Sequence, residues 1–138
     1  MAAAPVKWDV LARAAEAARA GAYAPYSGFA VGAAVLFEDG TVTSGANVEN
    51  ASSGLTVCAE RHALAAGVVG GHGRPRAVLV LADSPRPVPP CGACRQVLAE
   101  FAEAELPVQS RTLAGVQTTH TLGSLLPEAF GAAWLPRR

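Results

Sequence analysis

Apolar and polar positions follow two different patterns in the first fifty residues. Residues 7–20 combine strong helix formers with apolar side chains three and four apart, which predicts an amphipathic helix that Gly21 can end. Residues 29–50 contain two β-prone runs on either side of the turn dipeptide Asp39-Gly40, which predicts a β-hairpin.

The rest of the chain changes between helical and strand-like patterns several times. One short unbroken apolar run is typical of a strand that is buried on both faces. The later elements are a helix over 58–69, this buried strand over 76–83, a helix over 91–103, strands over 106–113 and 116–122, and a short helix over 122–130. This order predicts one mixed sheet covered by helices.

The composition narrows the class of protein. The chain has 138 residues, 51% of them apolar, so we expect a single domain spanning 1–138 whose core needs no disulfides. A formal net charge of zero disfavours nucleic acid as a partner. No apolar run approaches the roughly 20 residues of a membrane span, so no membrane partner is expected. The N-terminus lacks the pattern of a signal peptide, and free thiols favour the cytoplasm.

The cysteines are the first sign of chemistry. There are three, an odd number that excludes a fully paired disulfide framework and favours a metal site. Cys58, Cys91 and Cys94 all lie at predicted helix starts, where the helix dipole favours the thiolate that binds metal. Structural zinc normally has four protein ligands, whereas catalytic zinc keeps one position open for water. Three cysteines therefore favour a catalytic zinc site.

Two charged residues follow the first cysteine. Glu60 begins within one helical turn of the predicted metal and can carry protons to and from a bound water. The spacing Cys-x-Glu, followed about thirty residues later by Pro-Cys-x-x-Cys, is typical of zinc deaminases. Arg61 can donate hydrogen bonds to the sulfurs and offset the net charge of −1 that three thiolates and Zn²⁺ would carry.

Simpler interpretations exist for each of these residues. Cys91 and Cys94 alone fit a redox pair, and Cys58 alone fits a core position. Glu60 alone fits a surface residue favoured by the helix dipole. A structural zinc module would need a fourth protein ligand and would leave Glu60 unused. The scattered histidines, His62, His72 and His120, are not expected to be ligands.

Several motifs occur together in one order. The segments "APYSGFAVGAAV", "GANVENAS", "TVCAER", "PCGACRQVL" and "LLPEAF" resemble the small homotetrameric zinc-dependent cytidine deaminases, over residues of about 7 to 131. The resemblance implies a three-layer α/β/α sandwich with a five-stranded mixed sheet, and one zinc per subunit held by Cys58, Cys91 and Cys94. It also implies hydrolytic deamination of cytidine and 2′-deoxycytidine to uridine and 2′-deoxyuridine, with release of ammonia.

The resemblance assigns roles to individual residues. Glu60 would move protons from water to ring N3 and to the departing amine, and the Ala59 backbone would help to hold the pyrimidine. The remaining predicted contacts are stacking of Phe29 on the base, binding of the ribose hydroxyl by Asn47 and Glu49, and closure of a neighbouring subunit's pocket by Phe130. From the residues alone, Phe29 and Phe130 could equally pack within the protein, and Asn47 and Glu49 could be solvated.

One position departs from the family pattern. Ser53 stands where these deaminases usually have a tyrosine near the sugar, so an aromatic wall and a phenol are lost. This substitution leaves open an alternative function, the deamination of a modified cytosine nucleoside such as a nucleoside antibiotic. Deamination of polynucleotides is disfavoured, because such enzymes need a basic groove.

Overall fold

Five strands form one sheet in the order β2-β1-β3-β4-β5 in the computed structural model, which describes residues 4–136. Strands β3 and β4 are parallel, whereas the β1–β2, β1–β3 and β4–β5 pairs are antiparallel, so the predicted mixed sheet is confirmed. The strands are β1 (Val31–Phe37), β2 (Val42–Ala46), β3 (Pro75–Ala82), β4 (Pro107–Thr112) and β5 (Gln117–Thr121).

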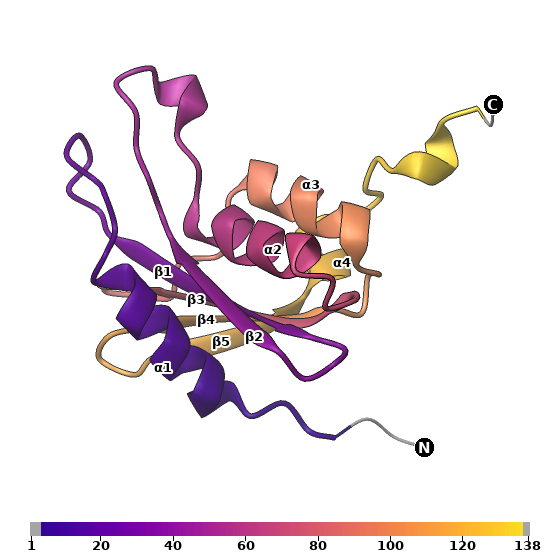
Figure 1. Ribbon diagram of the computed structural model, residues 1–138, viewed down its shortest axis with the longest axis horizontal. Helices are drawn as coiled ribbons and strands as arrows, with labels where there is room; N and C mark the ends of the chain where they lie inside the picture. The colour runs from indigo at the N-terminus through magenta and orange to yellow at the C-terminus, as the bar shows by residue number, and fades with distance from the viewer. Residues whose placement is uncertain (1–3, 137–138) are drawn as a thin grey trace.

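Helices cover both faces of the sheet. Helix α1 lies on one face, and α2 and α3 lie side by side on the other (Figure 1), so the predicted three-layer sandwich is confirmed. The α-helices are α1 (Trp8–Arg19), α2 (Ala59–Val69), α3 (Gly92–Phe101) and α4 (Leu122–Leu125). Two 3₁₀ turns, η1 (Ser53–Leu55) and η2 (Ala132–Trp134), lie in the connecting loop and the C-terminal segment.

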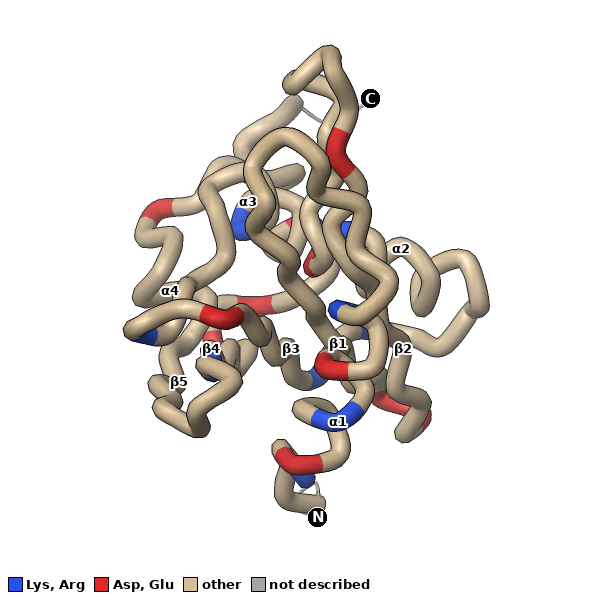
Figure 2. The backbone as a smooth tube through the Cα atoms, turned by 90° about the vertical axis from the view of Figure 1, so that its left-hand side faces the viewer, with Lys and Arg blue, Asp and Glu red and all other residues tan. Residues whose placement is uncertain are grey.

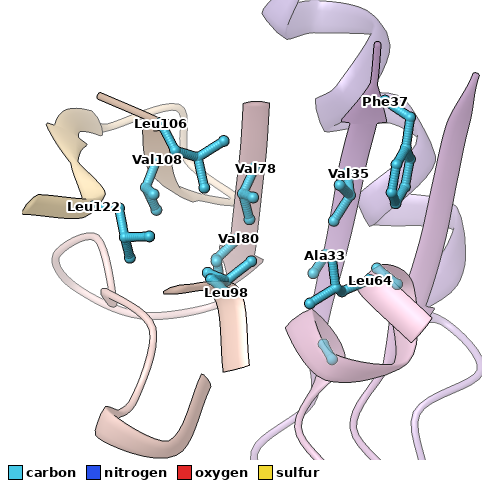
Figure 3. Packing of buried hydrophobic residues seen from close by; sticks show 12 residues of the cluster. Ala33, Val35, Phe37, Leu64, Val78, Val80, Leu98, Leu106, Val108 and Leu122 are labelled. Atoms are coloured by element: carbon cyan, nitrogen blue, oxygen red, sulfur yellow. The ribbon is translucent and has the colours of Figure 1, made fainter. Parts of the chain in front are cut away.

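Alternation along the central strands supplies two hydrophobic cores. In β1, Ala33, Val35 and Phe37 pack toward α2 and α3, whereas Ala34 and Leu36 pack toward α1. This follows from the period of two in a strand, and it requires apolar residues on both faces because both are covered. Figure 3 shows the larger core, where side chains of β1, β3 and β4 meet Leu64, Leu98 and Leu122 from the helices.

Two glycines allow α2 to approach the sheet closely. A Cβ at Gly45 of β2 would lie 2.7 Å from the backbone nitrogen of Ala63. A Cβ at Gly67 would lie 1.9 Å from the ring of Phe37. Because neither position has room for a side chain, α2 lies directly on β1 and β2, and its N-terminus is fixed relative to them.

The element order agrees with the sequence prediction, but the last helix is shorter than predicted. The prediction was a helix over 122–130, whereas α4 ends at Leu125. Leu126 precedes Pro127 and leaves the helical region, with φ −140° and ψ 73°, because a proline ring disfavours helical backbone at the residue before it. Glu128 then has a φ of +51°, which directs the C-terminal segment away from the body of the fold (Figure 1).

The charged residues of both signs are mixed over the molecule (Figure 2). Acidic and basic residues, 11 of each kind in the chain, are interspersed around the backbone (Figure 2). No helix within residues 4–136 is both long enough and apolar enough to cross a membrane. The predicted domain of 1–138 includes residues 1–3 and 137–138, which lie outside the described part.

Candidate metal centre and adjoining pocket

The three cysteines meet where two helices begin. Cys58 directly precedes α2, Cys91 directly precedes α3, and Cys94 lies in the first turn of α3. The Cys58 and Cys91 sulfurs are 3.7 Å apart, and the Cys91 and Cys94 sulfurs are 3.5 Å apart. All three sulfurs lie within 4.8 Å of one another, and they form the one group of three or more possible metal ligands among the described residues.

The sulfur separations fit a zinc ion. A tetrahedral site with Zn–S bonds of about 2.3 Å places its sulfurs about 3.8 Å apart, close to the two distances observed. A disulfide would instead bring two sulfurs to about 2.05 Å, and all three cysteines are free. Since the cluster offers three ligands, the residues present match a zinc site with an open fourth position.

The thiols strongly influence one another. A hydrogen bond with the Cys94 thiol and the nearby Arg61 guanidinium lower the pKa of the Cys58 thiol to about 5. The same contact with Cys58, together with burial and the Glu60 carboxylate, raises the pKa of Cys94. A cation held by the three sulfurs would displace the protons that remain on them.

Glu60 lies beside the cluster as the second residue of α2. Only 4% of the residue is exposed, and burial raises the pKa of its carboxyl group above the ordinary range. It lines the same pocket as Cys58 and Cys91. A buried carboxyl group that lies next to a metal cluster without belonging to it is placed to hold and transfer a proton.

Arg61 contacts the first cysteine as the sequence suggested. Its Nη2 donates to the carbonyl oxygen of Thr56 at 3.2 Å and lies 3.8 Å from the Cys58 sulfur. The guanidinium therefore fixes the segment that leads into Cys58 and places positive charge near the thiolate. Its predicted effect on the metal stays a prediction.

A pocket of about 270 Å³ opens from the cluster. It contains most of the residues that the sequence singled out, although they come from four separate segments. The lining residues are Ser27, Phe29, Val31, Asn47, Glu49, Thr56, Cys58, Ala59, Glu60, Val80, Val88, Pro89 and Cys91. Cys94 is fully buried beneath this lining, and neither Ser53 nor Phe130 belongs to it.

Asn47 and Glu49 hold the opposite wall of the pocket. The side-chain amide of Asn47 donates to the Phe29 carbonyl at 2.8 Å and accepts from the Val31 N–H at 2.9 Å. Glu49 accepts hydrogen bonds from the backbone N–H groups of Tyr26 (2.9 Å) and Ser27 (3.1 Å) and from the Ser27 hydroxyl. Both residues therefore order the loop that carries Phe29, in addition to facing the pocket.

The two predicted phenylalanine contacts lie in different surroundings. Phe29 is 37% exposed, so it is a pocket wall and not a core residue. Phe130 is 59% exposed and lies outside this chain's own pocket, where Gln96 holds its carbonyl oxygen at 2.8 Å. The predicted contact of Phe130 with a neighbouring subunit stays a prediction.

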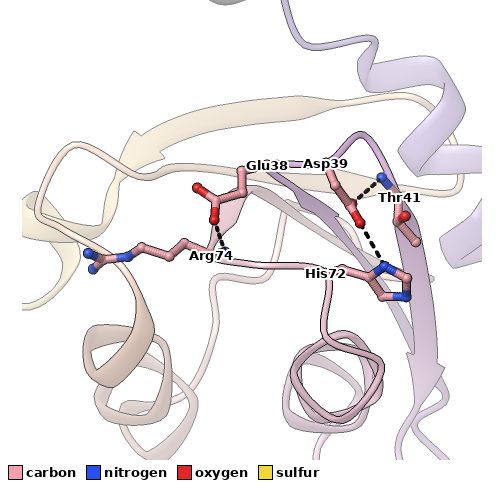
Figure 4. Close-up of polar contacts among 5 residues, drawn as sticks. All are labelled: Glu38, Asp39, Thr41, His72 and Arg74. Atoms are coloured by element: carbon pink, nitrogen blue, oxygen red, sulfur yellow. Dashed lines mark hydrogen bonds and ion pairs between the residues drawn. The ribbon is translucent and has the colours of Figure 1, made fainter.

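The histidines take part in contacts outside the pocket lining. The Nδ1 of His62 lies 2.8 Å from the Ala46 carbonyl and connects α2 to the end of β2. His72 pairs with Asp39 at 2.8 Å, between the end of α2 and the β1–β2 turn (Figure 4). His120 is exposed on β5.

Arg95 is a supporting residue that the sequence analysis did not single out. Arg95 donates from Nε to the Pro90 carbonyl at 2.7 Å and from Nη1 to the Leu125 carbonyl at 2.6 Å. It thereby ties the peptide that precedes Cys91 to the end of α4. The only signal in the sequence is an arginine directly after the last cysteine of an otherwise largely apolar helix.

Known proteins resemble this chain over most of its length. The signature of the cytidine and deoxycytidylate deaminase zinc-binding region matches residues 7–110. A cytidine deaminase of Halalkalibacterium halodurans is 55% identical over 115 residues, 83% of this chain and 87% of the relative. One of Mycobacterium tuberculosis is 47% identical over 136 residues, 96% of each. The crystal structure of cytidine deaminase from Burkholderia pseudomallei, 45% identical, has a TM-score of 0.86 and covers 91% of this chain and 100% of that chain.

Proposed function

Because this chain belongs to the cytidine and deoxycytidylate deaminase zinc-binding family, we propose that it hydrolyses cytidine and 2′-deoxycytidine to uridine and 2′-deoxyuridine with release of ammonia. The observation that carries this proposal is the cluster of three thiols with the buried carboxyl group of Glu60 beside it, where Cys58, Cys91 and Glu60 line one pocket. The named cytidine deaminases among its relatives support it.

The reaction replaces the amine at C4 of the pyrimidine with oxygen. Zinc held by Cys58, Cys91 and Cys94 would supply the acidification of a water molecule, whose pKa such sites lower to about 7. Glu60 accepts a proton from the attacking water and delivers it to ring N3. Once the oxygen has bonded to C4, Glu60 takes the remaining proton of that oxygen and passes it to the departing amine as the C4–N bond breaks, which leaves the C4 carbonyl of uridine. Cytidine and water thus give uridine and ammonia.

The rest of the pocket binds and orients the nucleoside. The backbone of Ala59 holds the pyrimidine edge, the ring of Phe29 stacks on the base, and Asn47 and Glu49 hold the ribose hydroxyl. The lining contains two carboxylates and no lysine or arginine. This charge disfavours a phosphorylated substrate, so we propose a free nucleoside and not a nucleotide.

Replacement of Glu60 tests the function directly. The wild-type protein should remove the cytosine absorbance of cytidine and of 2′-deoxycytidine. Glu60→Gln should retain zinc but turn over at least about 100-fold more slowly, because a general acid–base contributes about 10²–10⁴-fold. Glu16→Gln, an exposed change on α1, is the matched control and should behave as wild type. Wild-type protein with bound zinc and no turnover on either nucleoside would contradict the proposal.

We also propose that the chain acts as one catalytic domain in a cytoplasmic homotetramer, with one zinc per subunit. Free thiols favour a reducing compartment. A largely apolar groove of about 150 Å³ between α2 and α3 supports association of subunits, and so does the 88% exposure of Val69 in its lining. Phe130, Trp134 and Leu135 are likewise exposed on the C-terminal segment.

Light scattering on the eluting peak of a sizing column tests the assembly. The wild-type mass should be four times that of one chain, and Val69→Asp should shift it toward smaller species. A wild-type monomer at micromolar concentration would contradict the tetramer without affecting the proposed chemistry.

A further inference from the structure

Ser27 connects two walls of the pocket through a single hydroxyl group. Its Oγ donates to Oε2 of Glu49 and accepts from the backbone N–H of Phe29 at 3.0 Å. The backbone N–H of Ser27 also donates to Oε1 of Glu49 at 3.1 Å. Ser27, Phe29 and Glu49 all line the pocket, so the contacts lie where a ligand would bind.

We propose that Ser27 is a positioning residue for the nucleoside, which fixes the Glu49 carboxylate and the Phe29 backbone in one arrangement. This inference rests on the proposed function, because it gives Glu49 and Phe29 ligand contacts to support. Ser27 itself need not touch the ligand, since its one hydroxyl proton is already committed to Glu49.

The hydrogen bonds that Glu49 accepts within the protein leave it few free acceptor sites for a ligand. An ionised carboxylate offers about four lone-pair sites, and Oε1 already accepts two backbone N–H groups while Oε2 accepts the Ser27 hydroxyl. About one acceptor site remains, on Oε2. A carboxylate in this state can accept a hydrogen bond from a sugar hydroxyl but cannot donate one, so Ser27 holds in place an acceptor that suits a hydroxyl donor.

The loop does not depend on Ser27 for its attachment to the fold. The Tyr23 N–H donates to the Asn47 carbonyl at 3.0 Å, and the Glu49 N–H donates to the Tyr23 carbonyl at 2.8 Å. The Asn47 side chain separately holds the backbone of Phe29 and Val31. Loss of the Ser27 hydroxyl should therefore loosen the tip of the loop while the fold and the zinc cluster are retained.

Three variants test the role of the hydroxyl. Ser27→Ala removes it, Ser27→Thr retains it, and Ser44→Ala removes an exposed hydroxyl on β2 outside the pocket. Steady-state kinetics would give KM and kcat for cytidine, with zinc content and thermal unfolding measured on each protein. Calorimetric binding of cytidine and of 2′,3′-dideoxycytidine, in a Glu60→Gln background that slows turnover, would separate binding from chemistry.

The expected result is a hydroxyl-dependent loss of binding. Ser27→Ala should raise KM for cytidine about tenfold, the order expected for one charge-assisted hydrogen bond, and leave kcat within about twofold. Ser27→Ala should weaken binding of 2′,3′-dideoxycytidine by less than about threefold. That ligand lacks the 2′- and 3′-hydroxyls, from which Glu49 could accept a hydrogen bond. Ser27→Thr should lie within about threefold of wild type, and Ser44→Ala should match it.

Two results would overturn the role of Ser27. One is an unchanged KM and Kd in Ser27→Ala; the other is an equal loss for cytidine and 2′,3′-dideoxycytidine, which would indicate a general structural effect. A wild-type protein that binds cytidine in this hydroxyl-dependent way without turning it over would instead refute the proposed reaction and leave the role of Ser27 intact. The two failures are therefore distinguishable.

Discussion

Glu60 and Glu49 line the same pocket, but their surroundings shift the pKa values of their carboxyl groups in opposite directions. Burial raises the pKa of Glu60, whereas the Ser27 hydroxyl and the backbone N–H groups of the loop lower the pKa of Glu49. A carboxyl group with a raised pKa can carry a proton, and one with a lowered pKa remains a hydrogen-bond acceptor. The two side chains can therefore take different roles although their chemistry is the same.

Arg61 places a positive charge near the Cys58 sulfur. Arg61→Ala should weaken zinc binding about 10–100-fold, because residues that support metal ligands typically contribute that much, and Arg61 contacts the Cys58 thiol and the Thr56 carbonyl. Competition with a chromogenic zinc chelator would measure the affinity. Arg13→Ala, an exposed change on α1, serves as the control. Equal zinc affinity and equal activity in Arg61→Ala and wild type would show that Arg61 has no such role.

Spacing in the sequence predicted the thiol cluster but not the contacts around it. The three cysteines could be assigned to one site because each lies at the start of a predicted helix. Helix starts can be recognised from local signals in the sequence. The bonds from Asn47 to the Phe29 and Val31 backbone depend on how the loop before β1 lies beside the end of β2. The contacts of Arg95 with Pro90 and Leu125 cross 30 residues of chain in one case. No local pattern records these distances.

At the scale of elements, α2 and α3 begin in an unusual way. Their N-cap residues are Cys58 and Cys91, and neither side chain makes a capping hydrogen bond. Helix α4, by contrast, has Thr121 as its cap, with the hydroxyl accepting from the Ser124 N–H. A side-chain cap typically contributes about 1 kcal/mol. The N-cap position thus holds a possible metal ligand in α2 and α3, whereas in α4 it holds a side chain that caps the helix.

The packing of α2 on β1 gives a prediction about stability. Gly67→Ala should lower the free energy of unfolding by about 1–3 kcal/mol, because the new methyl group would overlap the buried Phe37 ring and overpacking of a core costs that much. The clash should exceed the gain of up to about 1 kcal/mol in helix propensity. Urea unfolding would measure the change.

Gly54→Ala is the matched control for this prediction. A Cβ at Gly54 would have no neighbouring atom within 4 Å. The unfolding midpoint of Gly54→Ala should therefore stay close to that of the wild type. If Gly67→Ala were as stable as the control, α2 would have room to move away from the sheet.

The β1–β2 turn carries a pH-dependent contact. Asp39 accepts from the Thr41 N–H and pairs with His72 (Figure 4), and these bonds lower the pKa of Asp39 from its ordinary value of 3.8. A lowered pKa means that Asp39 adds stability above about pH 3.8, and that this contribution is lost as the pH falls through the lower, folded-state value.

Asp39→Asn should therefore unfold at a lower temperature than wild type at neutral pH. Asparagine can still accept a hydrogen bond from the Thr41 N–H, but it lacks the negative charge with which Asp39 attracts the His72 ring. The difference should persist down to about pH 4 and narrow below it. Thermal unfolding of both proteins across pH 3–7 would measure it, and a constant difference at every pH would show that the charge on Asp39 is not its cause.

The β1–β2 turn was predicted correctly from the sequence, whereas the end of the last helix was not. The hairpin turn follows from Asp39-Gly40, where Gly40 adopts a φ of +89°. The helix predicted over 122–130 was too long, because Pro127 disfavours helical backbone at Leu126. The proline was visible in the sequence, so this boundary could have been predicted correctly.

At the scale of the whole molecule, the thiol cluster joins segments on either side of β3. Cys58 comes before this central strand and Cys91 after it, so an ion held by both would connect α2 and α3 directly. Removal of zinc should therefore lower the unfolding temperature by at least about 5 °C, since a ligand that binds only the folded state stabilises it by mass action. Scanning calorimetry before and after chelation would measure the shift.

Readdition of zinc provides the control for chelation. Both the unfolding temperature and the activity should return, whereas magnesium, which prefers oxygen ligands, should restore neither. An unchanged unfolding temperature in protein that has lost its zinc would mean that the ion does not hold α2 to α3.

The separation of the ligands along the chain has a consequence for folding. Cys91 and Cys94 are neighbours on one helical turn of α3, whereas Cys58 reaches them only through tertiary structure, because β3 separates α2 from α3 along the chain. In the folded protein, Cys58 is held close to the other two thiols, so its effective concentration at the metal site is high. This raises the affinity of the cluster for zinc without any new kind of bond. Tight retention of zinc should therefore depend on the tertiary structure that brings α2 beside α3.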